Sequence, residues 1–248
     1  MTVATDAAYV YGVVRAGSMD AVDVEGVGGS DVAVIGHGNL AALVSFVPAV
    51  DRRMSRRDLH RHLGVLEAAF AKTTVLPFRF GSAVESVDAL EQDVLAANSA
   101  AFLSALEHLQ GCMQFNVKAE YVEEAMLKAI VVPDRRIADL RERTQRLGDA
   151  GYYERLELGE RVAAAIAERR QQDAAGILDA LEEEAVDVAV EEPGEASALK
   201  AAFLVHEDRR DAFDRKLDAI ARERQATLRF EVIGPLPPTS FAMGAAGG

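Results

Sequence analysis

The residues of this sequence that could carry out chemistry are five histidines, one cysteine and several closely spaced carboxylates. No pair of histidines has the spacing of a His-Glu-x-x-His zinc motif, and His60 and His62 would point to different sides of a helix. Surface histidines are the simpler interpretation, and no metal site is predicted. Cys112 is expected between a helix and a strand, where a cysteine usually packs as a small hydrophobic residue. A catalytic thiol there would need partners that only the fold could bring near it.

Two further segments resemble binding or catalytic motifs only in composition. The glycine-rich segment 26–31 lacks the third glycine of a dinucleotide-binding fingerprint, and no helix is expected directly after it. The acidic run Glu182–Glu184 holds consecutive carboxylates, which mostly point in different directions and remain solvated rather than act as an acid–base pair. The sequence also lacks a Gly-x-Ser-x-Gly nucleophile motif. We therefore predict no catalytic residue, no cofactor and no metal ion.

Five arginines gather at the beginning of an expected helix, and they are five of the eight basic residues within 1–111: Arg52, Arg53, Arg56, Arg57 and Arg61. Positive charge near a helix N-terminus opposes the helix dipole, so the local structure gains nothing from it. Two interpretations remain open. The arginines form either a docking patch for an acidic partner surface or a solvated face paired with Asp51 and Asp58. We predict that four of them support partner contact: Arg52, Arg56, Arg57 and Arg61.

Composition and charge disfavour several classes of function. The chain has 248 residues, of which 27 are basic and 40 acidic, and its net charge is -13. An acidic surface repels phosphate groups, so binding to nucleic acid and to an anionic lipid membrane are both disfavoured. The single cysteine excludes an intramolecular disulfide, and a reducing, cytoplasmic setting fits best.

No targeting or membrane segment is expected. The first residues reach Asp6 without a basic region or an apolar run, so no signal peptide is visible. The uncharged stretch between Asp31 and Asp51 is interrupted by Gly36–Asn39 and closed by Pro48. A membrane helix needs about 20 mainly apolar residues without such an interruption.

Residues 1–111 have the pattern of a first α+β domain. Four segments that are rich in β-branched residues or alternate in polarity are expected as strands: 9–14, 22–27, 32–35 and 40–47. The last two flank Gly36–Asn39 as a plausible hairpin. A further strand is expected at 73–80, where Pro77 favours an edge of the sheet because proline lacks the N–H that a central strand donates.

Two helices are expected in the same domain. Ser55 can cap the first helix, with Asp58 as its capping-box partner. Apolar residues then recur in steps of three or four and predict a single apolar stripe: Leu59, Leu63, Leu66 and Phe70. Ser86 can cap the second helix, and Gly111 is expected to end it.

Residues 112–238 are expected to form a second domain. Four strands are indicated by alternating or continuous apolar residues: 113–121, 186–191, 199–205 and 228–232. A long alanine-rich helix over 151–183, preceded by a helical insertion over about 123–147, and a shorter helix over 207–224 connect them. The resulting order, β-α-β-β-α-β, is that of a ferredoxin-like fold. The fold class is therefore predicted as α+β with two domains and a flexible tail at 239–248.

Several motifs of the sequence resemble those of the gas vesicle protein L/F family. The most specific are Thr-Val-Leu-Pro-Phe-Arg-Phe-Gly at 74–81 and Gly-Pro-Leu-Pro-Pro at 234–238. Weaker similarities follow in the family's order along nearly the whole chain: 9–14, 57–60, 114–120 and 151–159. The resemblance implies two α+β domains, the second ferredoxin-like, in agreement with the strand pattern.

The resemblance also implies a function. The family's members are not known as enzymes, and they resemble accessory or minor structural proteins of gas vesicles, the hollow protein-walled flotation compartments of some prokaryotes. The implied partners are the small, very hydrophobic major shell protein and other accessory proteins of the vesicle. We therefore predict a protein of the cytoplasm and the gas vesicle that is not an enzyme. It is expected to bind the major shell protein, limit its aggregation and assist vesicle nucleation and assembly.

Two alternative functions stay open. The ferredoxin-like half could hold a small molecule between its sheet and its helices, as in an enzyme or a sensor, and a deep pocket with converging polar groups would favour this. A generic oligomeric scaffold would instead self-associate without preference for the shell protein. An RNA-recognition module is disfavoured, because Gln114, Asn116 and Lys118 stand where such modules place aromatic residues.

Overall fold

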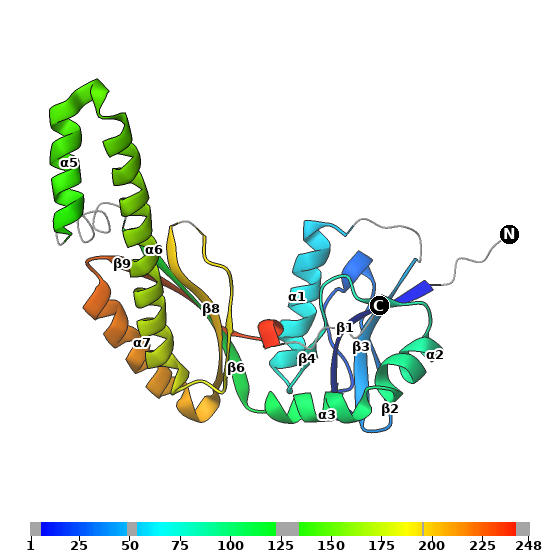
Figure 1. The fold of residues 1–248 in the computed structure, drawn as a ribbon. Helices are drawn as coiled ribbons and strands as arrows, with labels where there is room; N and C mark the ends of the chain where they lie inside the picture. The colour runs from blue at the N-terminus through cyan, green and yellow to red at the C-terminus, as the bar shows by residue number, and fades with distance from the viewer. Residues whose placement is uncertain (1–5, 49–53, 123–133, 195, 242–248) are drawn as a thin grey trace. The chain divides into compact units, whose positions relative to one another are not determined.

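The computed structural model describes residues 6–48, 54–122, 134–194 and 196–241. The chain forms two compact units (Figure 1). The first consists of Met1–Gln114 together with Pro235–Gly248, and the second of Phe115–Gly234. The chain therefore leaves the first unit along strand β6 (Cys112–Tyr121) and returns to it along strand β9 (Leu228–Leu236).

The C-terminal segment groups with the first unit, whereas the sequence-based division assigned residues up to 238 to the second domain. Thr239–Phe241 form a 3-10 turn rather than the beginning of a flexible tail. The Gln114 side-chain amide donates to Ser240 Oγ at 3.1 Å and accepts from the Ser240 backbone N–H at 2.9 Å. These bonds join the places where the chain leaves and re-enters the first unit. The remainder of the expected tail, 242–248, lies outside the described residues.

The sheet of the first unit is antiparallel, with the order β2-β3-β1-β4 and with β5 paired to β1. Its strands are β1 (Asp6–Arg15), β2 (Ala33–His37), β3 (Leu40–Pro48), β4 (Leu76–Pro77) and β5 (Ala83–Val84). The hairpin between β2 and β3 turns at Gly38, whose φ of 59° is readily adopted only by glycine. Leu40–Val44 are all buried, because β3 lies between two other strands.

Two expected strands differ from the prediction. Segment 22–27 is not a strand, since it makes one isolated bridge from Val22 to Val32 and then a 3-10 turn at Val27–Gly29. The Gly26 N–H donates to the Ser30 carbonyl at 2.8 Å, so the glycines fold this segment back before a ladder can form. The strand expected at 73–80 is reduced to β4, at the end of the strand order, because Pro77 has no N–H to extend the ladder.

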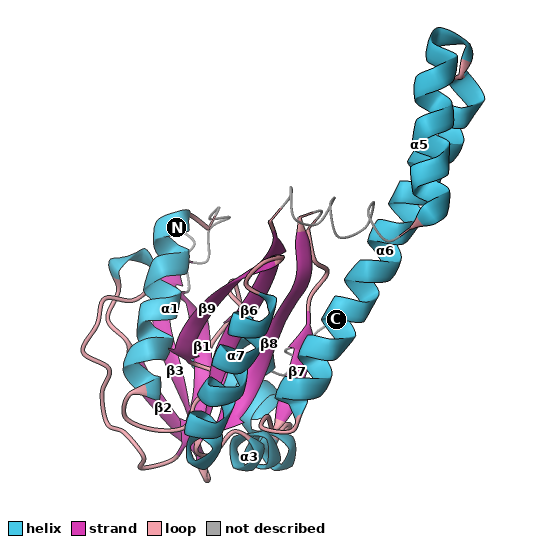
Figure 2. Cartoon of the chain, turned by 90° about the vertical axis from the view of Figure 1, so that its left-hand side faces the viewer, coloured by secondary structure: helices cyan, strands magenta, loops and turns pink. Residues whose placement is uncertain are grey.

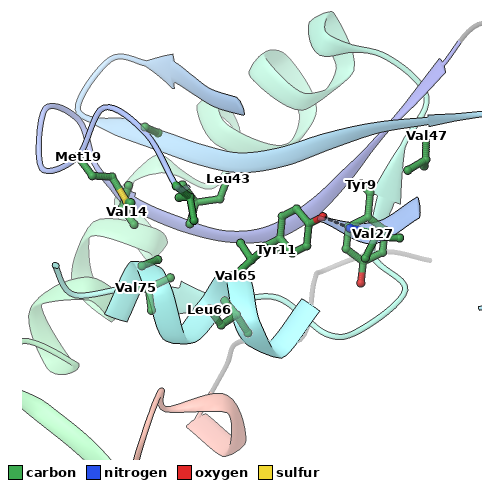
Figure 3. Packing of buried hydrophobic residues seen from close by; sticks show 13 residues of the cluster. Tyr9, Tyr11, Val14, Met19, Val27, Leu43, Val47, Val65, Leu66 and Val75 are labelled. Atoms are coloured by element: carbon green, nitrogen blue, oxygen red, sulfur yellow. Dashed lines mark hydrogen bonds between the residues drawn. The ribbon is translucent and has the colours of Figure 1, made fainter. Parts of the chain in front are cut away.

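Helix α1 (Arg56–Phe70) packs on this sheet and closes the main core of the first unit (Figure 3). Buried side chains of β1, β3 and α1 meet there: Tyr9, Tyr11, Val14, Leu43, Val65 and Leu66. The Tyr11 hydroxyl accepts the Val27 N–H at 2.6 Å and so fixes the glycine-rich turn to the core. Complete burial of a leucine such as Leu66 contributes about 1.5–3 kcal/mol.

The second helix of the first unit is interrupted. It consists of α2 (Val87–Ala89), a π-helical segment (Leu90–Ala96) and α3 (Ser99–His108). Ser86 caps its beginning as predicted, since its Oγ accepts the Ala89 N–H at 3.1 Å. The interruption lies at Asn98, whose side-chain amide donates to the Val94 carbonyl at 2.9 Å and satisfies it locally. Gly111, with a φ of 68°, follows the last turn.

The second unit contains a four-stranded sheet with the order β7-β8-β6-β9, where β7 is Asp187–Val190 and β8 is Ser197–His206. Helices α6 (Tyr152–Glu182) and α7 (Arg210–Arg224) pack on one face of the sheet (Figure 2). Phe213 of α7 lies against Phe115 and Phe203, with ring centroids 5.4 and 5.5 Å away. The chain as a whole therefore has an α+β fold with two sheets, as predicted.

Helix α6 is much longer than the sheet requires. Its 31 residues form one unbroken helix, which would span about 46 Å at 1.5 Å per residue. Its buried residues lie in the C-terminal half, at Asp173, Ile177 and Leu181. Its N-terminal half pairs with α5 (Arg135–Leu147), and the two helices form an arm that extends away from the sheet (Figures 1 and 2). The expected insertion therefore contains α5, while 123–133 lie outside the described residues.

A buried aspartate fixes α6 to the body of the second unit. Asp173 accepts hydrogen bonds from Tyr121 of β6 at 2.9 Å and from Arg169 at 2.8 Å, and Arg224 of α7 donates to it at 3.0 Å. A Cβ on Gly176 would stand 2.8 Å from the Arg224 guanidinium, so glycine provides room for the pair. Burial, followed by the hydrogen bond to Asp173, raises the pKa of Tyr121 above its usual range.

Candidate protein-binding surface

Helix α1 begins with the capping box that the sequence predicts. Ser55 Oγ accepts the Asp58 N–H at 3.2 Å, and an Asp58 carboxylate oxygen accepts the Ser55 N–H at 3.0 Å. The other carboxylate oxygen of Asp58 accepts the N–H of Gly28 at 3.2 Å. The beginning of α1 is thus fixed both to itself and to the glycine-rich turn, which orients the residues that follow.

The buried face of α1 differs from the prediction. The residues that face the core are Asp58, His62, Val65, Leu66 and Ala69. Of the expected stripe, only Leu66 is fully buried, whereas Leu59 is 39% and Leu63 37% exposed. The helix is rotated because two polar residues find partners inside the core. Leu59 and Leu63 therefore face outward.

His62 is the centre of the polar group under α1. Its Nδ1 lies 2.9 Å from the Tyr9 hydroxyl oxygen, and its ring stacks on Tyr11 with centroids 5.6 Å apart. Burial lowers the pKa of His62 to about 4, and burial raises the pKa of Tyr9 to about 12. Both groups are therefore neutral near pH 7. A general acid or base at that pH needs a pKa close to 7, so this group has a structural character.

The outward face of α1 combines exposed apolar and basic side chains. Arg56, Leu59 and Leu63 follow at steps of three and four and share one face, and Arg57 stands beside them. We refer to these four residues as the α1 surface. Phe80, also partly exposed, has its ring centroid 5.6 Å from that of His62 and so lies close to α1. The α1 surface has the composition of a contact patch, with apolar side chains next to guanidinium groups.

The four arginines of the predicted site have different surroundings. Arg61 is largely buried. Its guanidinium group pairs with the Glu25 carboxylate at 2.6 Å and lies 3.9 Å from the Asp58 carboxylate. Arg56 and Arg57 are exposed, and neither has an ion-pair partner within the described residues. Arg52 lies outside the described residues. The structure thus separates an arginine used within the fold from two whose charges face solvent, and it adds Leu59 and Leu63, which sequence periodicity assigned to the core.

One protein-family model, described as gas vesicle synthesis protein GvpL/GvpF, matches residues 7–243. The chain belongs to this family. The match extends over both units and therefore covers the α1 surface as well as the α5–α6 arm.

Relatives within the family are similar over almost their full length. The chain is 38% identical over 236 residues to gas vesicle protein F of a Streptomyces species, covering 94% of this chain and 98% of that protein. It is 26% identical over 241 residues to gas vesicle protein F1 of Halobacterium salinarum, covering 96% of this chain and 93% of that protein. The family is one of gas vesicle proteins and is not a known enzyme family.

Solved structures of family members have the same fold. The crystal structure of gas vesicle protein GvpF from Anabaena superposes with a TM-score of 0.84 at 24% identity, covering 96% of this chain and 98% of that chain. The corresponding structure from Microcystis aeruginosa gives a TM-score of 0.77 at 21% identity, covering 96% and 99%. At these identities the similarity establishes the fold.

Other candidate sites in the described residues are less developed. No group of three or more histidine, cysteine, aspartate or glutamate side chains is placed there to hold a metal ion. Cys112 is buried, and its thiol lies 3.7 Å from the His108 carbonyl oxygen and 3.6 Å from that of Gln110. These contacts match the packing role expected for a cysteine at a helix-to-strand junction. None of the helices in the described ranges is long and apolar enough to span a membrane.

A shallow groove lies on the sheet of the second unit. Its volume is about 190 Å³, and its lining includes Asn116, Lys118, Lys200 and Ile233. Lys118 pairs with Glu120 at 2.6 Å and Lys200 with Glu191 at 2.5 Å, so both ammonium groups already have partners. Pockets for small molecules usually have volumes of about 300–1,000 Å³. The groove does not favour the alternative of a ligand-binding enzyme or sensor.

Proposed function

We propose that this protein is a gas vesicle accessory protein that binds the hydrophobic major shell protein, limits its aggregation, and assists vesicle nucleation and assembly. The family match, which covers nearly the whole chain, supports the vesicle role. The observation that supports protein binding is the α1 surface, where apolar side chains stand beside guanidinium groups that have no ion-pair partner in the described part of the chain. The proposed setting is the cytoplasm and the growing vesicle, with other vesicle accessory proteins as further partners.

The physical basis is the covering of apolar surface. A shell subunit with exposed apolar helices or strands tends to aggregate before it is assembled. Contact with Leu59 and Leu63 would remove apolar surface of both proteins from water, with about 1–2 kcal/mol from each leucine. The net charge of -13 would keep the complex soluble until the subunit joins the wall.

The guanidinium groups of Arg56 and Arg57 would add specificity. They lie at the N-terminal end of α1, where positive charge is unfavourable for the helix, so fold stability does not account for them. Because no acid among the described residues pairs with either group, a carboxylate of the partner could do so. Of the four arginines predicted from the sequence, Arg56 and Arg57 are therefore the proposed contact residues. Arg61 pairs within the fold, and Arg52 lies outside the described residues.

Co-expression with the shell protein tests the proposal. A tagged chain should co-purify with the shell subunit, and the double variant Leu59→Ser, Leu63→Ser should lose most of that association. Val24→Ser is a matched control, because Val24 is also 37% exposed and lies in the same unit. Far-ultraviolet circular dichroism should show unchanged folding for all variants. A folded double variant that retains the full amount of bound shell protein would remove α1 from the proposal.

We further propose that the second unit is a ferredoxin-like domain. Its described elements occur in the order β6, α5 and α6, β7, β8, α7, β9. When the strands are numbered along the chain, the sheet order β9-β6-β8-β7 becomes 4-1-3-2, and α5 is an addition before the first long helix. This order and the placement of α6 and α7 on one face support the assignment.

A further inference from the structure

Helix α5 has a charge opposite to that of the chain. It contains five arginines and two carboxylates, a net charge of +3 in a protein whose net charge is -13. Arg146 pairs with Glu142 at 2.5 Å. Among the described residues, the other four have no ion-pair partner: Arg135, Arg136, Arg141 and Arg143. This concentration of guanidinium groups, beyond what the carboxylates of α5 can neutralise, makes α5 a basic surface on an acidic protein.

Large apolar and aromatic side chains are exposed next to these arginines, at the turn between α5 and α6. They are Leu147 at 44%, Tyr152 at 62%, Tyr153 at 79% and Leu156 at 52% of full exposure. Leu147 follows Arg143 by one helical turn, and Leu156 follows Tyr152 by one turn, so each pair forms part of a ridge. We refer to these four side chains as the arm tip.

The arm tip is held in place by bonds within the arm. Ile137 and Leu140 are buried in the pairing of α5 with α6, and Arg161 of α6 lies 3.5 Å from Asp134, which caps α5. At the turn, the Arg155 guanidinium donates to the Gly148 carbonyl at 2.6 Å. The hydrogen bonds of Asp173 fix α6 below the arm. The exposed ridges are thus preorganised, and binding to them requires little further ordering.

Fold stability does not explain this composition. The exposed apolar side chains of the arm tip contribute little to any core, and the five arginines of α5 outnumber the two carboxylates of the same helix. A bound partner would account for both features. Exposed tyrosine and arginine side chains are the types most often found at the energetic centre of protein interfaces.

We propose that the α5–α6 arm docks an acidic amphipathic helix of a protein partner. The apolar side of that helix packs on the arm tip, and its carboxylates face the α5 arginines. An antiparallel helix pair is suited to accept a third helix along its groove. Arginine and tyrosine also suit nucleic acid, but the net charge of -13 repels a phosphate backbone, and Leu147 and Leu156 offer no stacking surface to bases.

The proposal goes beyond the proposed function, since it does not require the partner to be the shell protein. It also concerns the second unit, whereas the α1 surface belongs to the first. Variants of one surface leave the other intact. Loss of shell-protein binding on changing α1 and loss of helix binding on changing the arm are therefore separate results.

The experiment measures binding of the full chain to synthetic helical peptides of about 20 residues, long enough to form an isolated helix. One peptide has leucine on one face and glutamate on the other, a second has leucine and lysine, and a third has serine and glutamate. Fluorescence anisotropy should show binding of the leucine–glutamate peptide only, and the affinity should fall as salt is added.

Two double variants localise the contact. Tyr152→Ser with Leu156→Ser should weaken binding about 10-fold or more by removing interface anchors. Arg136→Glu with Arg143→Glu should have a similar effect and should also reduce the salt dependence. Matched controls in the same unit, with unchanged binding expected, are Val190→Ser with Val232→Ser for exposed apolar groups and Arg215→Glu with Arg222→Glu for charge.

Several results would overturn the proposal. One is binding of the leucine–lysine peptide as tight as that of the leucine–glutamate peptide. Another is binding of the leucine–glutamate peptide that neither arm variant changes, when circular dichroism shows that both variants are folded. Arm-dependent binding of single-stranded DNA or of vesicles with anionic lipid, in place of the peptide, would assign the arm to another class of partner. Arm-dependent dimerisation in sedimentation analysis, without peptide binding, would identify the occupant as a second copy.

Discussion

Helices α1 and α6 each bury an aspartate, and the two aspartates are satisfied in different ways. Asp58, in the first turn of α1, accepts the backbone N–H groups of Ser55, which caps the helix, and of Gly28 in the glycine-rich turn. Asp173 lies more than half-way along α6 and binds the side chains of Tyr121, Arg169 and Arg224. Asp58 fixes the beginning of α1. Asp173 fixes α6 in the part that lies on the sheet, below the N-terminal half that pairs with α5.

This difference explains what each helix exposes. Because Asp58 and His62 occupy the inner face of α1, apolar residues are left on its outer face along the length of a helix that lies on the core. Because α6 is anchored at Asp173, its N-terminal half needs no support from the sheet and carries its exposed residues at the far end. A buried charge thus determines the place of the exposed apolar groups in both units.

The largest expected effect is on the anchor of α6. Asp173→Ala leaves the guanidinium groups of Arg169 and Arg224 without their carboxylate, and should lower the free energy of unfolding by about 3–5 kcal/mol. Urea denaturation followed by circular dichroism measures this loss. Asp179→Ala, an exposed position on the same helix, is the control and should change stability little. An equal effect of the two substitutions would show that the anchor is not specific.

The second prediction concerns the pH dependence of the α1 core. The pKa of His62 is about 4 in the fold against about 6.5 unfolded, so as the pH falls below 6.5 the unfolded chain takes up a proton that the folded chain does not. The contribution of this group, roughly 3 kcal/mol, is present above pH 6.5 and lost as the pH falls to 4.

Denaturation at a series of pH values tests this prediction. His62→Gln should flatten the stability profile between pH 4 and 6.5 relative to the natural protein, whereas His60→Gln, at an exposed position of the same helix, should leave it unchanged. Parallel profiles for all three proteins would show that His62 does not carry the effect.

A smaller effect is expected at the beginning of α1. Asp58→Ala removes the acceptor for Ser55 and Gly28 and should cost about 1–2 kcal/mol of stability. Glu67→Ala on the exposed side of α1 is the control. If Asp58→Ala lowers the free energy of unfolding more than Asp173→Ala does, hydrogen bonds to the backbone at a helix end stabilise this fold more than the side-chain bonds of Asp173, contrary to the prediction.

The smallest effect has the opposite sign. Arg56→Glu with Arg57→Glu replaces positive by negative charge at a helix N-terminus and should stabilise the fold by about 0.3–1 kcal/mol. The same variant should weaken binding to the shell protein in the co-purification experiment. Thermal unfolding measures the first effect, and Arg215→Glu with Arg222→Glu on α7 is the charge-matched control. Lower stability together with full binding would contradict the proposed role of these arginines.

The sequence was sufficient where structure depends on neighbouring residues. The alternation of Phe115, Val117 and Ala119 with polar residues predicted β6, because a strand with one covered face shows this period directly. The capping box of Ser55 and Asp58 was predicted for the same reason, since both partners lie within one helical turn. The long helix at 151–183 also agrees with α6 within one residue at each end.

Features that depend on distant partners were not predicted. The inner face of α1 includes His62, whose partner Tyr9 is 53 residues away, so periodicity alone assigned Leu59 and Leu63 to the core. The sequence does not distinguish the role of Arg61 from that of Arg56, because the ion-pair partner of Arg61, Glu25, lies 36 positions earlier in the chain. The exposed arm tip was missed because Tyr152 and Leu156 carry the same apolar signal as buried residues of the same helix.

The bonds between Gln114 and Ser240 have a consequence for synthesis of the protein. Because the first unit includes residues from both ends of the chain, a ribosome must produce all of 115–234 before the first unit receives its last segment. The inserted unit can therefore fold while the surrounding one is still incomplete. The first unit can therefore be completed only after residues 235–240 have been synthesised.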